Sequence, residues 1–165
     1  MVVLGIDPGI ASLGWGIINK TEEVTYKVEA YGCINTDKRS LFSRRLEEIH
    51  KELSRIIRKY EPDVAAIEQL FFAKNVKTAI SVGEARGVAI LAAVEANLPV
   101  AEYTPLQVKK SLVGYGRAEK KQIQKMLKVL LGLRDIPKPD DAADALAVAL
   151  CHLNSQKMAE LRKLE

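Results

Sequence analysis

Apolar and polar positions along the first 36 residues predict three β-strands. The apolar runs are rich in Val, Ile and Tyr, and each is bounded by polar residues or glycine. The three predicted strands are residues 2–7, 13–19 and 24–36. Gly9, Gly14, Gly16 and the polar segment 19–23 mark the expected turns. Connections this short predict an antiparallel meander.

Beyond the meander, segments with helical periodicity alternate with short apolar runs. Residues 63–68 and 99–103 are predicted to be buried strands. The predicted helices are residues 38–59, 75–96, 105–112, 118–131 and 140–156. Because strands that alternate with helices favour parallel pairing, the sequence predicts an α/β fold. We expect a mixed five-stranded sheet, three antiparallel strands and then two parallel ones, flanked by helices on both faces.

The length of 165 residues fits one domain with a substantial core. Its composition, 48% apolar and 28% charged, is ordinary for a globular protein. There is no internal repeat and no low-complexity linker. We expect a single domain over residues 1–156 and a flexible C-terminal tail over residues 157–165.

The sequence predicts neither a zinc site nor a membrane helix. Cys33 and Cys151 are expected to be small buried side chains, and with His50 and His152 they form no zinc-binding spacing. The first residues lack a basic segment followed by a long apolar run. No stretch approaches the roughly 18 uninterrupted apolar residues of a membrane helix. We therefore expect a cytoplasmic protein that does not associate with membranes.

The net charge of +4 is unevenly distributed. Residues 38–59 carry +5 and residues 109–128 carry +6, so the rest of the chain carries −7. Two basic segments beside an acidic remainder indicate a bound polyanion, for which nucleic acid is the obvious candidate. The alternative for residues 38–59 is strong, because this segment is an amphipathic helix whose charges could form only a solvated surface.

The predicted helix 75–96 is apolar on nearly every side. Such a helix must be covered all round, and within a small domain the sheet covers only part of it. A symmetric partner could cover the rest, with Gly83 and Gly87 allowing two backbones to approach closely. A central core helix is an equally good interpretation. A monomer in sedimentation would contradict the dimer.

Four carboxylates stand at positions typical of a metal site. Asp7 and Glu68 each end a predicted apolar strand, and Asp141 and Asp144 open the last predicted helix, three residues apart on one face. A half-buried carboxylate is unfavourable unless a cation compensates its charge. Oxygen ligands favour Mg²⁺ or Mn²⁺ over zinc. We therefore expect the four acids to meet at one edge of the sheet and to hold metal.

Each acid also has a structural interpretation. Asp7 before Pro8 and Gly9 could simply begin a turn. Asp140 is interpreted as a helix N-cap, and Asp141 could share that role. Neither alternative accounts for Asp144, which lies one turn further into the helix, or for Glu68 at the end of an apolar strand, so the four acids together favour a metal site.

Two further segments could contact nucleic acid. The segment 69–75 contains Phe71 and Phe72, one of which could stack on an unpaired base, with Lys74 and Lys77 near phosphate. Both aromatic rings could instead pack under the loop. Residues 114–121 predict a glycine-containing turn into a helix N-terminus, a favourable place for phosphate. This segment fits neither a dinucleotide-binding motif nor a P-loop.

Several segments, taken in order over nearly the whole chain, resemble the RuvC family of Holliday junction resolvases. They are residues 5–9, 13–16, 66–69, 87–89 and 141–146. The resemblance implies a ribonuclease H-like fold and a homodimer. It also implies Mg²⁺-dependent paired nicking of a four-way DNA junction in recombination and repair, and partnership with the RuvA and RuvB branch-migration proteins.

The resemblance also implies roles for individual residues. The catalytic and metal-binding acids of the family fall on Asp7, Glu68, Asp141 and Asp144, the same four acids. Lys109 and Lys120 resemble the family's basic residues near the active site, and Phe71 resembles the aromatic that stacks on a junction base. The site would hold two Mg²⁺ ions, which Mn²⁺ could replace, with Lys120 among the catalytic residues. The expected DNA contacts are Phe71, Lys74, Lys77, Lys109, Arg117, Lys120 and Lys121.

Three other functions share some of these features. An RNA-processing nuclease of the same fold would use similar acids and would prefer an RNA–DNA hybrid. A sugar kinase or actin-like ATPase also begins with a strand, an Asp and glycines, but needs a second domain that this chain is too short to supply. A non-catalytic junction-binding protein would need only the basic segments, and the full acid set argues against it.

Overall fold

Five strands form one mixed sheet in the order β3–β2–β1–β4–β5. The strands are β1 (Val2–Asp7), β2 (Ser12–Lys20), β3 (Tyr26–Asn35), β4 (Val64–Glu68) and β5 (Val100–Tyr103). The first three pair antiparallel, whereas β4 pairs parallel to β1 and β5 parallel to β4. The predicted fold class is therefore confirmed. This computed structural model describes residues 1–165 except 22–24, 71–75 and 163–165, and also leaves out the side chains of residues 76–77 and 157–162.

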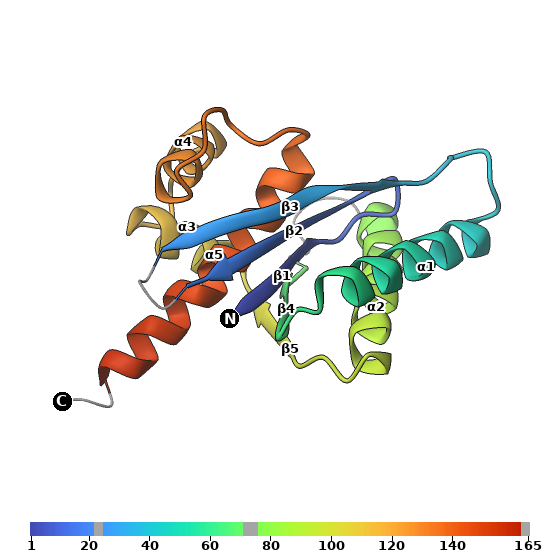
Figure 1. The fold of residues 1–165 in the computed structure, drawn as a ribbon. Coiled ribbons are helices and arrows are strands. Elements are labelled where there is room, and N and C mark those ends of the chain that lie inside the picture. Colours follow the sequence, from blue (N-terminus) through green and yellow to red (C-terminus); the bar gives the residue numbers. More distant parts are fainter. Residues whose placement is uncertain (22–24, 71–75, 163–165) are drawn as a thin grey trace.

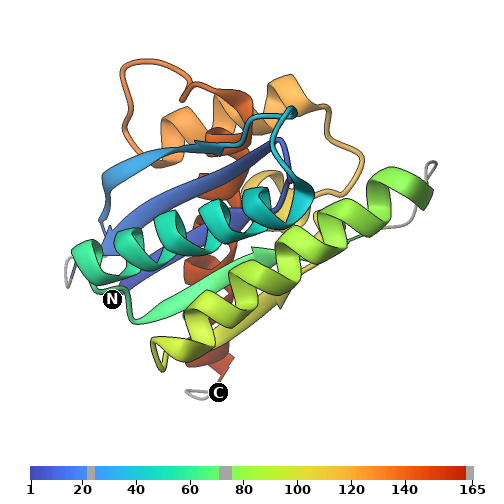
Figure 2. The ribbon, with the colours of Figure 1, turned by 90° about the vertical axis from the view of Figure 1, so that its right-hand side faces the viewer.

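Helices cover both faces of the sheet (Figures 1 and 2). They are α1 (Phe42–Tyr60), α2 (Val76–Glu95), α3 (Pro105–Val113), α4 (Lys120–Leu130) and α5 (Asp140–Arg162). Helices α1 and α2 lie side by side on one face, and α5 lies on the other, with α3 and α4 beside it. None of the helices in the described part of the chain is both long and apolar enough to cross a membrane.

Alternate residues of each strand feed two separate apolar cores. Val3 and Ile18 pack under α5, whereas their neighbours Leu4 and Ile17 pack under α1 and α2. This follows from the two-residue period of a strand, which sends successive side chains to opposite faces. A sheet covered in this way leaves its strand ends as the place where polar groups can gather.

Glycines of β1 and β2 let α5 lie close to the sheet. A Cβ atom on Gly5 would overlap the main-chain oxygen of Ala145, and one on Gly14 would overlap that of Asp141. A Cβ atom on Gly16 would press against Leu146. The prediction that Gly14 and Gly16 mark turns is wrong, because both lie inside β2 and serve the close approach of the helix.

The last helix is longer than predicted. It continues to Arg162, past residue 156, where the sequence predicted the end of the domain. The predicted boundary thus falls inside α5. The single domain over residues 1–156 and the flexibility of residues 157–165 stay predictions.

Candidate active site

Two of the predicted acids end neighbouring parallel strands. Asp7 is the last residue of β1 and Glu68 the last of β4, and the two strands pair in register up to Ile6 and Ile67. The carboxyl ends of parallel strands meet at one edge of a sheet, where α/β folds bind ligands. Both side chains therefore emerge at the same edge.

The first turn of α5 brings the other two acids to this edge. Gly14 pairs with Asp7 across β1 and β2, and the main chain of Asp141 lies directly against Gly14. Asp141 is thus placed beside Asp7 by backbone packing. Asp144 follows one turn later on the same side of the helix.

Three of the four acids form a tight group. Asp7, Asp141 and Asp144 each offer a carboxylate oxygen, and these oxygens all lie within 4.8 Å of one another. Oxygen ligands of one Mg²⁺ lie about 2.0–2.1 Å from the ion, so small rotations would let the three share a cation. The donor set, oxygen only and partly buried, fits Mg²⁺ or Mn²⁺. Glu68 lies outside this group of three but acts electrostatically on Asp7.

The protein environment makes ionisation of the two strand-end acids costly. Burial and then the charges of Glu68, Asp144 and Asp141 raise the pKa of Asp7 to about 8, with Lys120 opposing the shift. Burial and the charge of Asp144 raise the pKa of Glu68 to about 7. A bound cation would remove this cost, so the site is electrostatically prepared for one.

A pocket of about 250 Å³ joins the acids to two lysines. Its polar lining comes from Glu68, Lys109, Lys120 and Asp144, and its apolar lining from Pro105, Val108, Ile123 and Ala147. The pocket lies where the end of β4 meets the three helices α3, α4 and α5. A pocket lined by both carboxylates and ammonium groups can hold a phosphate next to a metal ion.

A capping box fixes the helix that carries Lys109. The hydroxyl of Thr104, directly after β5, accepts a hydrogen bond from the main-chain nitrogen of Gln107 (3.2 Å), and the Gln107 side chain accepts one from that of Thr104 (2.8 Å). Helix α3 therefore begins immediately at the sheet edge. This places Lys109, one turn further on, in the pocket.

Lys120 opens α4 and reaches α5. Its ammonium group donates a hydrogen bond to Asp144 Oδ2 at 2.9 Å and lies 3.6 Å from Asp140 Oδ2. The hydrogen bond to Asp144 raises the pKa of Lys120. The structure thus brings Lys120 into direct contact with one of the candidate metal ligands.

Asp140 has a different role from the one that the sequence indicated. It is the first residue of α5, and its Oδ1 accepts hydrogen bonds from Gln124 Nε2 (3.2 Å) and Lys138 Nζ (3.0 Å). Together with Lys120, these cationic and amide donors hold the pKa of Asp140 below its usual value. The interpretation as an N-cap missed these contacts because Gln124 belongs to another helix.

The remaining predicted DNA contacts fall into two groups. Arg117 and Lys121 are exposed, just before and inside the first turn of α4. Phe71 and Lys74 lie outside the described residues, as does the side chain of Lys77 at the start of α2.

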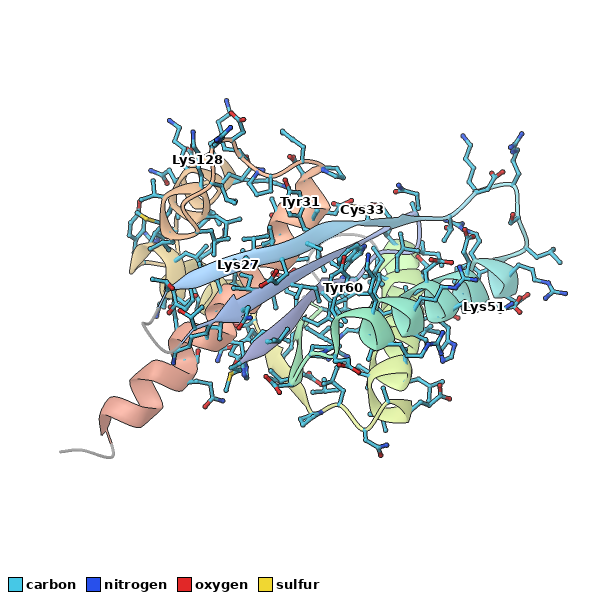
Figure 3. The ribbon with its side chains drawn as sticks, in the orientation of Figure 1. Lys27, Tyr31, Cys33, Lys51, Tyr60 and Lys128 are labelled. Carbon is cyan, nitrogen blue, oxygen red and sulfur yellow. The ribbon has the colours of Figure 1, made fainter. Side chains whose placement is uncertain are left out.

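The two basic segments lie on opposite faces of the sheet. Figure 3 shows Lys51 on α1 and Lys128 on α4, on either side of it. On α1, Glu47 pairs with Arg44 (2.7 Å) and Lys51 (2.5 Å). Exposed pairs of this kind are typical of a solvated helix surface. Only the second basic segment, through Lys109 and Lys120, reaches the acids.

Cys33 is a neighbour of the acids that the sequence did not indicate. It lies on β3 (Figure 3) and is half-buried, whereas Cys151 is fully buried, as expected. Burial raises the pKa of the Cys33 thiol, and the charges of Asp141 and Asp7 add to the shift. A spacing argument could not find it, because the contact depends on the pairing of β2 with β3.

The sheet order and the acidic strand edge define a nuclease of the ribonuclease H-like fold. A sequence profile of the family described as crossover junction endodeoxyribonuclease RuvC matches residues 3–152. The chain therefore belongs to the RuvC family of crossover junction endodeoxyribonucleases. The predicted family, fold and class of enzyme are confirmed.

Relatives and a solved structure agree with this assignment. The chain is 56% identical over 165 residues to crossover junction endodeoxyribonuclease RuvC of Alkaliphilus oremlandii, with both chains fully covered. It is 61% identical over 155 residues to the RuvC protein of Caldicellulosiruptor saccharolyticus, covering 94% of this chain and 93% of the other. T. thermophilus RuvC in complex with a Holliday junction substrate superposes with a TM-score of 0.88 at 34% identity, covering 96% of each chain.

Proposed function

We propose that this protein resolves four-way DNA junctions in recombination and repair by paired, symmetric nicks in strands of like polarity. The products carry 5′-phosphate and 3′-hydroxyl ends. The observation that carries the proposal is the group of three carboxylates, with oxygens within 4.8 Å, beside a pocket that contains Glu68 and two lysines. The similarity to T. thermophilus RuvC in complex with a Holliday junction substrate supports a junction as the substrate.

Asp7, Glu68, Asp141 and Asp144 hold the metal, and we propose two Mg²⁺ ions per site, with Mn²⁺ able to replace them. Ions held by these four acids would supply activation of the attacking water and stabilisation of the leaving 3′ oxygen. The raised pKa values of Asp7 and Glu68 support this assignment, because a cation would compensate the charges that the metal-free site disfavours.

The basic residues bind and orient the DNA backbone. Lys120 offsets negative charge on the phosphate in the transition state, and Lys109, across the same pocket, holds the phosphate. Arg117 and Lys121 lie near the N-terminus of α4, where backbone N–H groups favour an anion. Phe71 is assigned to stacking on an unpaired junction base, and Lys74 and Lys77 to phosphate contacts.

A homodimer supplies one site for each of the two cuts. The outer face of α2 is apolar and exposed: Ile80 is 57% exposed, Leu91 50% and Val94 57%. A Cβ atom added to Gly87 would meet nothing within 4 Å among the described residues. A second copy packed here would cover the apolar surface and match a nearly two-fold junction. RuvA and RuvB are further expected partners, and this role agrees with the cytoplasmic location predicted from the sequence.

The test compares a labelled four-way junction with matched duplex DNA and an RNA–DNA hybrid, each with Mg²⁺ or EDTA. We expect paired, Mg²⁺-dependent nicks confined to the junction. Cleavage of the hybrid alone would move the protein to the RNA-processing nucleases. Junction binding with no cleavage under any condition would make it a structural binder.

A further inference from the structure

Lys120 lies between two carboxylates that differ in their relation to the metal site. Its ammonium group is 2.9 Å from Asp144 Oδ2 and 3.6 Å from Asp140 Oδ2. Asp144 belongs to the group of three acids, and Asp140 does not. The ammonium is therefore bonded to a candidate metal ligand while a second carboxylate stands beside it.

The Asp140 carboxylate is held with one oxygen directed at Lys120. Its Oδ1 accepts hydrogen bonds from Gln124, whose residue is 8% exposed, and from Lys138. The other oxygen, Oδ2, is the one nearest to Lys120. Contacts from α4 and from the segment before α5 thus fix its orientation.

We propose that Lys120 is an exchangeable counter-ion of Asp144, and that Asp140 is a positioning residue that holds the Lys120 ammonium once Asp144 has bound a divalent cation. The inference rests on the proposed metal site. It gives a function to Asp140, which lies outside the candidate ligands.

Charge and distance support the exchange. A divalent cation on the Asp144 carboxylate repels the ammonium of Lys120, so the two cations compete for this carboxylate. The second carboxylate is already within ion-pair distance, so a small rotation of the Lys120 side chain completes the move. The side chains of Lys120 and Asp140 are about half exposed and that of Asp144 is 35% exposed, so each ion pair is weak and the free-energy difference between them is small. Lys120 then stays at the pocket, where it can meet a phosphate.

Mn²⁺ binding to the DNA-free protein, measured by calorimetry, tests the proposal without catalysis. Lys120→Met removes the competing cation and should raise the Mn²⁺ affinity about two- to fivefold, the range of an exposed ion pair. Asp140→Asn keeps the oxygen that Gln124 needs but weakens the alternative position for the ammonium. It should lower the affinity by about twofold or more.

The double variant is decisive. If Asp140 acts through Lys120, Asp140→Asn should leave the Mn²⁺ affinity unchanged in the Lys120→Met background. An equal loss in both backgrounds would mean that Asp140 contributes only its charge, and would overturn the inference. The matched control is Asp135→Asn. Asp135 is an exposed acid in the connection between α4 and α5, and its change should alter the Mn²⁺ affinity less than Asp140→Asn does.

Failure of the metal site itself gives a different result. If the wild-type protein binds no Mn²⁺, the proposed function fails together with the inference. If wild type binds Mn²⁺ but Lys120→Met does not raise the affinity, only the inference fails. Thermal unfolding of each variant shows whether it is folded. Asp140→Glu, which keeps a carboxylate at this position, should recover most of the wild-type affinity for Mn²⁺.

The ¹⁵N NMR signal of the Lys120 ammonium gives a second readout. If Asp140 only stabilised the fold, the response of this signal to Mg²⁺ would not depend on Asp140. On Mg²⁺ addition, this signal should shift and stay visible in wild type, because Asp140 slows exchange with water. In Asp140→Asn it should broaden. The same Mg²⁺ response in both proteins would contradict the proposal.

Discussion

Glu68 and Asp144, from β4 and α5, line the same pocket, and after burial the charge of Asp144 is the main cause that raises the pKa of Glu68 to about 7. The two residues are far apart in the sequence, yet the fold makes the ionisation of one depend on the other. Asp7 adds a third interacting carboxyl with a pKa of about 8. Ionisation of these carboxyl groups is therefore unfavourable without a bound cation, and the stability of the protein should depend on pH.

Without metal, the protein should lose stability as the pH rises from 5 to 8. Asp7 and Glu68 bind their protons more tightly in the folded state than in the unfolded chain, where their pKa values are the ordinary 3.8 and 4.5. Their contribution to the free energy of unfolding is complete below these unfolded-state pKa values. It is lost as the pH rises through the folded-state pKa of about 7 for Glu68 and about 8 for Asp7. Urea denaturation in EDTA at several pH values measures the slope. Asp7→Asn should flatten it, and an unchanged slope would contradict the assignment.

Asp7→Asn should abolish cleavage and leave junction binding intact. Loss of a metal ligand should lower the cleavage rate more than about 100-fold, since even residues that only support ligands cost 10–100-fold. Binding depends on the basic residues and should change little. Gel shifts with a junction in EDTA and single-turnover cleavage in Mg²⁺ measure the two effects. Wild-type cleavage by this variant would show that the metal site is misplaced.

Lys109 and Lys110 are adjacent lysines that should differ sharply. Lys109 lines the pocket with Glu68, whereas Lys110 is exposed outside it. Lys109→Ala should reduce cleavage about 100-fold, because the phosphate would lose one of the two ammonium groups of the pocket. Lys110→Ala should change it less than about twofold, because it removes only a distant surface charge. Equal effects of the two changes on the cleavage rate would argue against a role for the pocket.

Leu91→Glu should weaken the homodimer. The substitution puts a charge on the exposed apolar face of α2, where its burial against a second copy would be costly. We expect the dimer dissociation constant to rise more than about tenfold in sedimentation, and paired cuts to become single nicks. Val129→Glu, at an exposed apolar residue of α4, is the control and should leave the dimer intact. A wild-type monomer at micromolar concentration would reject the dimer.

Gly14→Ala should destabilise the fold, whereas Gly87→Ala should not. A Cβ atom at Gly14 would overlap the main chain of Asp141, and overpacking of this kind costs about 1–3 kcal/mol. In a single copy of the chain Gly87 is exposed on α2, where a Gly-to-Ala change adds up to about 1 kcal/mol to the stability of the monomer. Urea denaturation compares the two variants. Equal stabilities would mean that α5 does not rest on β2.

Much of the fold follows from residue periodicity. Strands such as β4 are short apolar runs, and the apolar stripe of α1 repeats at helical spacing, so their existence could be predicted. The positions of Asp7 and Glu68 at strand ends were visible for the same reason. The end of α5 was predicted too early, because its last turns carry polar residues of the kind that are typical of a flexible tail.

Other features depend on contacts between distant segments and could not be predicted. A glycine gives the same local signal in a turn and under a packed helix, which is why Gly14 and Gly16 were misinterpreted. Asp140 after prolines looks like a cap, and only the packing of α4 on α5 reveals Gln124 and Lys120 as its partners. A charge pattern alone also could not tell that α1 lies on the face of the sheet opposite to α5, the helix that carries Asp141 and Asp144.

The glycine contacts under α5 make the spacing of the acids robust. Because Gly5 and Gly14 meet main-chain atoms of the helix, the height of α5 above the sheet is set by backbone rather than by variable side chains. Substitutions elsewhere in the apolar cores can then lower the stability of the protein without moving Asp141 relative to Asp7.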